Sequence, residues 1–198
     1  MCAVIGIDGV VSTDLVRNIF LQSQIRGRHA TGVSYLKHGK ITTIKEPKPA
    51  EEFLDKHNPE DWYDGDRITM IGHCRYSTSD LQYNQPIAND EKAVVHNGVI
   101  SQEMPENWEK LYGYKCETKN DSELLFHSWD VKKWPDASIA AIFLDQSGIQ
   151  WARNGKRPLW ISWNDDLAIV ITSTKDIAKR AGMKTTERVY YKGDDLQP

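Results

Sequence analysis

Cys2 is the reactive residue with the most unusual position, because it directly follows the initiator methionine. Removal of Met1 would leave a thiol and an α-amino group on the same residue. A cysteine thiol titrates at about pH 8.5 and an α-amino group at about pH 8, so the amine can relay the thiol proton without a histidine. Cys2 could therefore act as an N-terminal nucleophile. The simpler alternative is a small hydrophobic residue at the start of a strand.

Four further motifs contain residues that could bind or activate a substrate. They are Arg26-Gly-Arg-His-Ala-Thr-Gly32, Gly72-His-Cys-Arg-Tyr-Ser-Thr78, His96-Asn-Gly-Val-Ile100 and Asn120-Asp-Ser-Glu123. Each has a simpler interpretation on its own. Arg75 could be a solvated charge at a strand end, Asn97-Gly98 a type I′ hairpin turn and Asp121 a helix N-cap. The residue types alone leave these alternatives open.

Together with the initial Met-Cys, the order and spacing of these motifs resemble the glutaminase domain of class II glutamine amidotransferases, which are N-terminal-nucleophile hydrolases. The segments 152–160 and 171–175 are similar to the later hairpin of that domain and to the strand before its last helix. The resemblance extends from residue 2 to about residue 180. It implies an α+β fold formed by a single domain over 1–198. In this fold two antiparallel sheets lie between helical layers, as a four-layer αββα sandwich.

The resemblance also implies how the chemistry is divided among the residues. In such domains the N-terminal cysteine attacks the side-chain amide of glutamine, forms a γ-glutamyl thioester and releases ammonia before water completes the hydrolysis. Cys2 matches this nucleophile. The attack creates an oxyanion that needs fixed hydrogen-bond donors, and the Asn97 amide and the Gly98 backbone N–H match them. Arg26 and Gly27 match a loop that supports the cysteine.

Recognition of free glutamine requires one group for the α-carboxylate and one for the α-ammonium. Arg75 matches the arginine that pairs with the carboxylate, because a planar guanidinium can bond to two oxygens at once. Asp121 matches the acidic residue that holds the ammonium. Tyr76, Ser77 and Thr78 are expected to help position the carboxylate. The resemblance implies no cofactor and no metal.

The hydrophobic pattern predicts the scaffold that positions these residues. Apolar residues recur at three- and four-residue spacing after Ser12 or Thr13, which predicts a helix of about 10–12 residues. Further helices are expected at 49–56, 101–112, 122–131 and 174–181. Strands are expected at 2–7, 32–36, 41–44, 67–74, 93–96, 137–143, 150–153, 159–163, 168–172 and 187–191, with the four between 137 and 172 as successive hairpins. The polar stretch 46–66 is expected to be exposed.

Length and composition limit the classes of protein. The 198 residues carry a formal net charge of −3 without a block of like charges, so no nucleic-acid partner is expected. No apolar run approaches the roughly 18 residues of a membrane span, and no signal peptide is recognisable, which together predict a cytoplasmic protein without membrane contact. The three cysteines form no disulfide framework. A zinc site built from Cys2, Cys74, Cys116 and a histidine is a minor alternative, because their spacing fits no ligand pattern.

The expected biological context depends on the family resemblance. Most members of the family continue into a synthase domain that consumes the ammonia, whereas this sequence contains only the ammonia-producing half. We therefore expect a separate ammonia-accepting synthase subunit as partner. The alternatives are a free-standing hydrolase of glutamine or of another γ-glutamyl amide, an excised domain, and a catalytically silent module that binds glutamine or serves as a scaffold. The presence of Cys2, Arg75, Asn97, Gly98 and Asp121 favours an enzyme.

Overall fold

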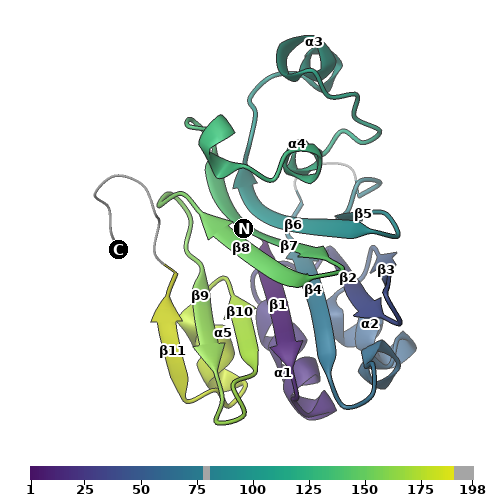
Figure 1. Cartoon of the computed structure of the whole chain (residues 1–198), viewed down its shortest axis with the longest axis vertical. Coiled ribbons are helices and arrows are strands. Elements are labelled where there is room, and N and C mark those ends of the chain that lie inside the picture. The colour runs from purple at the N-terminus through teal and green to yellow at the C-terminus, as the bar shows by residue number, and fades with distance from the viewer. Residues whose placement is uncertain (78–80, 190–198) are drawn as a thin grey trace.

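The computed structural model describes residues 1–77 and 81–189, and β-strands form its centre (Figure 1). The strands are β1 Ala3–Gly9, β2 Ala30–Lys37, β3 Lys40–Glu46, β4 Ile68–Arg75, β5 Ile87–Ala88, β6 Lys92–Val99, β7 Ser138–Asp145, β8 Gly148–Arg153, β9 Trp160–Trp163, β10 Ile169–Thr172 and β11 Thr185–Arg188. The helices are α1 Thr13–Ser23, α2 Ala50–Lys56, α3 Trp108–Tyr112, α4 Ser122–His127 and α5 Lys175–Arg180. Within these residues one antiparallel sheet has the order β11-β9-β10-β1-β4-β2-β3, and a second has the order β5-β6-β7-β8.

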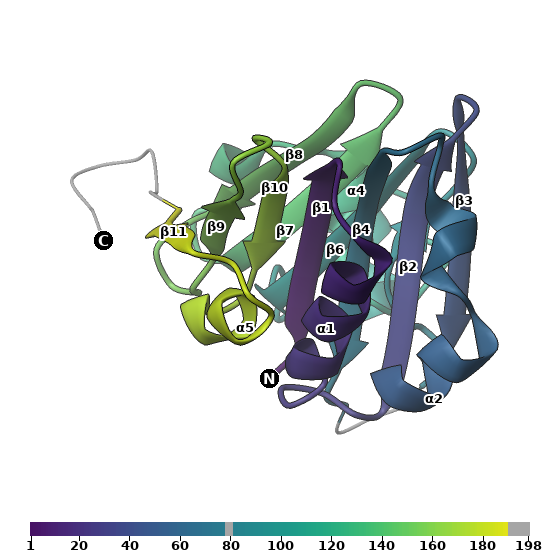
Figure 2. The ribbon, with the colours of Figure 1, turned by 90° about the horizontal axis from the view of Figure 1, so that it is seen from below.

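The two sheets pack face to face, and helices cover both outer faces. Figure 2 shows α1, α2 and α5 on the outer face of the larger sheet, and Figure 1 shows α3 and α4 beyond the smaller one. In the part of the chain that the structure describes, buried side chains form three apolar clusters, one in each gap between neighbouring layers. The predicted four-layer αββα sandwich is therefore confirmed.

Strand β1 lies in the middle of the larger sheet because both of its faces are apolar. Ile5 packs toward the helical layer, whereas Val4 packs between the two sheets. A continuous apolar run, rather than strict alternation, is typical of a strand that is buried on both faces. Ala3 pairs with Cys74 of β4, so the N-terminus of the chain reaches the end of β4 that carries Arg75.

Helix α1 has the predicted position and length. Ser12 caps it, since the Ser12 hydroxyl accepts a hydrogen bond from the Leu15 N–H at 3.1 Å. Val16 and Phe20 are fully buried against the larger sheet. The helix ends at Ser23, and the loop that leads to β2 lies at the same end of the larger sheet as the N-terminus. Among the described residues, no helix is both long and apolar enough to cross a membrane.

Several details differ from the sequence prediction. Phe53 and Trp62 are buried, so the stretch 46–66 is not wholly exposed. Strands β8 and β9 do not form a hairpin, because the chain crosses from the smaller to the larger sheet between them. The helix expected at 101–112 shortens to α3, since Met104 is extended before Pro105. The helix expected at 122–131 ends at His127, where the chain becomes extended. The last expected strand is β11, and its predicted residues from 190 lie outside the described part.

Candidate active site

Cys2 lies at the entrance to β1, next to the end of β4. Because Ala3 pairs with Cys74, continuing this register by one residue places Cys2 opposite Arg75. The side chain is half-buried, and its Sγ lies 3.7 Å from the backbone oxygen of Tyr76. The fold therefore brings the predicted nucleophile next to the arginine that is predicted to bind a carboxylate.

Arg26 and Gly27 lie in the loop after α1 and contact the same corner of the sheet. Arg26 Nε donates a hydrogen bond to the backbone oxygen of Cys2 at 2.9 Å. Burial lowers the pKa of Arg26, while the neighbouring Cys2 raises it and Arg157 lowers it further. A Cβ atom at Gly27 would lie 2.3–2.6 Å from backbone atoms of residues 74–76. Only glycine allows this loop to approach the end of β4 so closely.

Asn97 lies inside β6, so the interpretation of Asn97-Gly98 as a hairpin turn is wrong. The residue is 4% exposed, and its buried Nδ2 has no hydrogen-bond partner within the described residues. Such groups are rare, because leaving a buried donor unsatisfied costs about 1–3 kcal/mol. The Asn97 amide N–H is therefore available to donate to a ligand.

Gly98 contributes a backbone donor at the edge of β6. Its φ is +144°, and a Cβ there would lie 1.8 Å from the Ser138 oxygen, so a side chain does not fit. Gly98 pairs with Ile139 of β7, whose backbone N–H and C=O both bond to Asn154 on the other side. In an antiparallel pair of this kind both residues direct their backbone groups outward. The Gly98 N–H therefore points away from β7, toward the β5 side.

Arg75 and Asp121 line one pocket, although they are far apart in the sequence. The pocket has a volume of about 460 Å³. Its lining residues come from the end of β4, the start of α3 and the three segments that precede β5, α3 and α4, and they are Arg75, Tyr83, Ser101, Glu103, Pro105, Trp108, Lys119, Asn120 and Asp121. A guanidinium and a carboxylate in one pocket are complementary to the carboxylate and the ammonium of a free amino acid.

Asp121 occupies the N-cap position of α4, but its side chain does not cap the helix. Asp121 Oδ2 accepts hydrogen bonds from the backbone N–H groups of Ile100 at 2.6 Å and Ser101 at 3.1 Å. Asn120 binds the first turn instead, since its Oδ1 accepts from the Ser122 N–H at 3.1 Å. The carboxylate of Asp121 is thus fixed to the chain that leaves β6, shortly after Asn97 and Gly98.

The loop 81–86 holds Arg75 in place, a role that the sequence did not reveal. Arg75 Nη1 donates to Asn84 Oδ1 at 2.7 Å and to the Tyr83 oxygen at 3.3 Å. Lys45 Nζ donates to the Asn84 oxygen at 3.0 Å, and burial lowers the pKa of Lys45. Asn120 Nδ2 also donates to the Tyr83 oxygen, at 3.0 Å. The loop therefore connects the arginine to the segment that carries Asp121.

Two of the three residues expected to help position the carboxylate are described, and Thr78 lies outside the described part. Tyr76 is 53% exposed, and its ring stacks on His29 with the centroids 5.1 Å apart. The Ser77 N–H donates to His29 Nδ1 at 2.9 Å. His29 thus braces the segment after β4. A role of Tyr76 and Ser77 in carboxylate binding stays a prediction.

Two buried histidines border the motifs. Burial, followed by the charge of Arg75, lowers the pKa of His73 to about 3. Burial also lowers the pKa of His96, although the nearby Asp121 acts in the opposite direction. Both imidazoles are therefore neutral at physiological pH. They are suited to hydrogen bonding and not to storing a proton.

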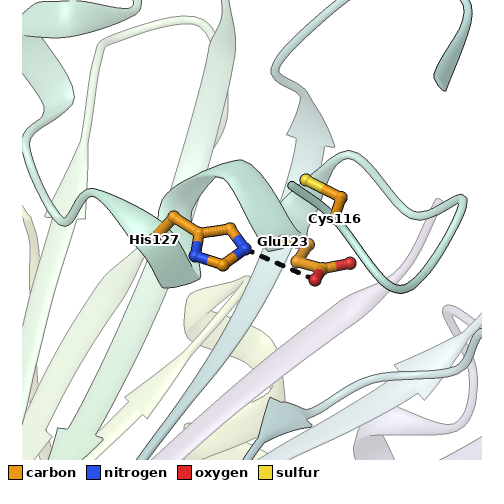
Figure 3. A group of neighbouring side chains, drawn as sticks. All are labelled: Cys116, Glu123 and His127. Carbon is orange, nitrogen blue, oxygen red and sulfur yellow. Dashed lines mark ion pairs between the residues drawn. The ribbon is translucent and has the colours of Figure 1, made fainter. Parts of the chain in front are cut away.

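Figure 3 shows a second group of side chains with metal-ligand chemistry, formed by Cys116, Glu123 and His127. Their ligand atoms lie within 4.8 Å of one another, with His127 Nε2 3.4 Å from Glu123 Oε1. The Glu123 carboxylate is already occupied. It accepts hydrogen bonds from the Glu117 N–H at 2.8 Å and from the N–H and hydroxyl of Thr118 at 2.7 and 2.6 Å. Glu123 therefore fixes the loop before α4 through these hydrogen bonds.

The zinc alternative built on all three cysteines is wrong. Cys74 belongs to the cluster between the larger sheet and its helices, whereas Cys116 packs against the cluster beneath α3 and α4. Both sheets lie between these two clusters, so the two thiols cannot share an ion. Burial raises the pKa of the Cys74 thiol to about 12 and that of the Cys116 thiol to about 11.

Comparison with solved structures identifies the class of fold. The chain matches glutamine phosphoribosylpyrophosphate amidotransferase from B. subtilis over 96% of its length, with a TM-score of 0.73 and 21% identity. A structure described as the allosteric regulatory enzyme of purine biosynthesis matches over 96% as well, with a TM-score of 0.75 and 22% identity. No family model matches the sequence, and no curated protein matches it.

A third solved structure is similar over most of both chains. It is a glutamine aminotransferase class-II domain protein from Silicibacter pomeroyi, with a TM-score of 0.55 and 15% identity over 87% of this chain and 88% of that one. By contrast, the chain spans 45% of each of the first two matched chains. At these identities the similarity shows the fold. The chain thus has the Ntn-hydrolase fold of class II glutamine amidotransferase domains, as the sequence predicted.

Proposed function

We propose that this protein hydrolyses the side-chain amide of glutamine to glutamate and ammonia, with Cys2 as the nucleophile. The observation that carries the proposal is the pocket lined by both Arg75 and Asp121. Hydrogen bonds to charged groups contribute about 1.5–3 kcal/mol each, so this pair can select a free amino acid. The register that places Cys2 opposite Arg75 supports the same assignment.

The proposed reaction begins with removal of Met1, which is 66% exposed. The freed α-amine of Cys2 accepts the thiol proton, and the thiolate attacks the amide carbon while the carbonyl electron pair moves onto oxygen. Asn97 Nδ2 and the Gly98 N–H donate to this oxyanion. The C–N bond then breaks, and the α-ammonium of Cys2 protonates the leaving nitrogen, which departs as ammonia. Water attacks the γ-glutamyl thioester, with the amine as base, and glutamate leaves.

The experiment combines intact mass with an assay of glutamate release from glutamine. We expect a protein without Met1, steady turnover, and a single adduct on Cys2 after treatment with the glutamine analogue 6-diazo-5-oxo-norleucine. Cys2→Ser should abolish both turnover and the adduct. Cys116→Ser serves as the matched control, because Cys116 is also half-buried and lies on another layer. Wild-type turnover in Cys2→Ser would contradict the mechanism.

The acceptor of the ammonia stays a prediction that rests on the family resemblance. A separate synthase subunit is expected to raise the rate of glutamine hydrolysis when it binds. Comparing the rates with and without a candidate subunit therefore tests whether that subunit is the partner. A processed protein that carries the adduct but releases no glutamate would instead favour another γ-glutamyl amide as substrate.

A further inference from the structure

The β5–β6 ladder stops shortly before Asn97 and Gly98. Ile87 pairs with Val94, so the same antiparallel register would place Gln85 opposite His96. The backbone does not complete this pair, because the carbonyl of Gln85 lies over β2. A Cβ at Gly32 would lie 2.2 Å from the Gln85 oxygen. The backbone groups of His96 therefore need another partner.

The side-chain amide of Gln85 supplies this partner. Gln85 Oε1 accepts from the His96 N–H at 2.6 Å, and Gln85 Nε2 donates to the His96 oxygen at 3.1 Å. These are the two bonds that a strand backbone would make in this position. Along that edge of β6 the next outward N–H belongs to Gly98, two residues on. The side chain thus ends the ladder and leaves the Gly98 donor open to a ligand.

Gln85 also connects β6 to the start of α4 through a directed chain of hydrogen bonds. Its Nε2 donates to Ser122 Oγ at 3.0 Å, and Ser122 Oγ lies 3.0 Å from His96 Nδ1. His96 Nε2 lies 3.0 Å from the Ser138 oxygen. A carbonyl only accepts, so the network assigns the proton to Nε2, and Nδ1 accepts from the Ser122 hydroxyl. In this hydrogen-bond network each group therefore donates to the next, from Gln85 through Ser122 and His96 to the Ser138 oxygen.

Two members of this hydrogen-bond network adjoin groups of the proposed site. The Ser138 oxygen, where the network ends, lies against Gly98, and Ser122, in the middle of the network, directly follows Asp121 in the sequence. We propose that Gln85 is a positioning residue for the amide hydrolysis, an inference that rests on the proposed function. Its amide fixes the Gly98 donor relative to Asp121 by joining β6 and α4 in one hydrogen-bonded unit. Gln85 is 6% exposed, so water does not compete for these bonds.

The test is Gln85→Glu, which keeps the shape and removes both N–H donors. A carboxylate at this position can only accept, so the Ser122 hydroxyl turns toward it and His96 Nδ1 loses its donor. We expect kcat for glutamine to fall about 100-fold, the size of effect that a misplaced catalytic group produces. We also expect the ¹⁵N NMR signals of His96 to change from the Nε2–H tautomer to a form protonated at Nδ1.

The control is Gln150→Glu, which makes the same charge change at an exposed site of β8. Gln150 Oε1 accepts from Trp129 Nε1, and a carboxylate keeps that bond. This variant should retain kcat within twofold and leave His96 unchanged. If Gln85→Glu does not fold, Ser122→Ala breaks the same chain by removing one oxygen and should lower kcat in the same direction.

The outcomes separate this inference from the proposed function. A wild-type protein that turns over glutamine, with Gln85→Glu equal to it in kcat and in the His96 tautomer, overturns the role of Gln85 alone. Loss of thermal stability with an unchanged kcat does the same, because it shows a merely structural role. A processed wild-type protein without turnover overturns the proposed function, and the positioning role with it.

Discussion

The clearest test of the proposed oxyanion site is Asn97→Ala. Removing one preorganised oxyanion donor typically lowers kcat by about 10²- to 10³-fold, which corresponds to about 3–4 kcal/mol. Asn97 Nδ2 is buried and has no partner within the described residues, so it is available to stabilise a developing charge. We therefore expect a loss of kcat of this size, with little change in KM, because the donor acts mainly in the transition state.

The effect of the same substitution on stability should be small, because two opposing contributions nearly cancel. Truncation removes roughly 25 Å³, which at ~24 cal/mol per Å³ of cavity costs about 0.6 kcal/mol. Removal of an unsatisfied buried donor relieves a penalty of about 1–3 kcal/mol. The two effects oppose each other, so Asn97→Ala should match or slightly exceed the wild-type melting temperature. A group that is kept for catalysis is expected to show this combination of lost activity and retained stability.

Asn164→Ala is the matched control for this prediction. Asn164 Oδ1 accepts from the Ala168 N–H at 2.9 Å in the turn between β9 and β10, where its bond is satisfied. Its removal should cost about 1 kcal/mol of stability and leave kcat unchanged. The assay is glutamate release per alkylatable Cys2, with melting temperatures from calorimetry. A normal kcat in Asn97→Ala, or a melting temperature more than about 6 °C lower, would refute the reasoning, since about 2–4 °C corresponds to 1 kcal/mol at this chain length.

Three further predictions concern binding, packing and pH. Arg75→Ala and Asp121→Ala each remove one charged contact, so KM for glutamine should rise about 10- to 100-fold in the glutamate assay. Gly27→Ala places a Cβ 2.3 Å from backbone that cannot yield, and calorimetry should show a loss of about 1–3 kcal/mol. The pKa of His73 is lowered to about 3 in the folded chain, from about 6.5 when unfolded, so the unfolded state binds the proton first. The contribution of His73 to the free energy of unfolding should be complete above about pH 7 and should fall toward pH 3 by up to ~1.4 kcal/mol per pH unit. Between pH 7 and 5 the melting temperature of His73→Gln should therefore decrease less than that of the wild-type protein.

The sequence predicted the elements whose pattern is local. The apolar run of β1, the cap and periodicity of α1 and the β2–β3 hairpin follow from spacing, because each element buries its side chains in a regular direction. The layer arrangement came from the family resemblance. The chain crossing between β8 and β9 was not predictable from local pattern, because two successive strands look the same whether or not they pair.

The candidate site shows where local signals mislead. Asn97-Gly98 has the composition of a hairpin turn, yet both residues lie in β6, because pairing with β7 determines their conformation. Asp121 has the composition of an N-cap, yet its carboxylate binds the chain after β6. In both cases a long-range contact uses a residue type whose local preference is well known. The motif order indicated the site, whereas these contacts define its geometry.

Two glycines explain the positions of Gln85 and His96, whose roles the sequence did not show. A Cβ at Gly32 would meet the Gln85 oxygen at 2.2 Å, and one at Gly98 would meet the Ser138 oxygen at 1.8 Å. A glycine inside a strand often marks a close approach of another backbone, but it does not say which segment approaches. At Gly32 the approaching segment carries the side-chain amide that bonds to the edge of β6, and at Gly98 it carries the carbonyl that accepts a hydrogen bond from His96. The two glycines thus permit the contacts through which Gln85 and His96 hold β6, and a larger residue at either position would separate β6 from the segments that support it.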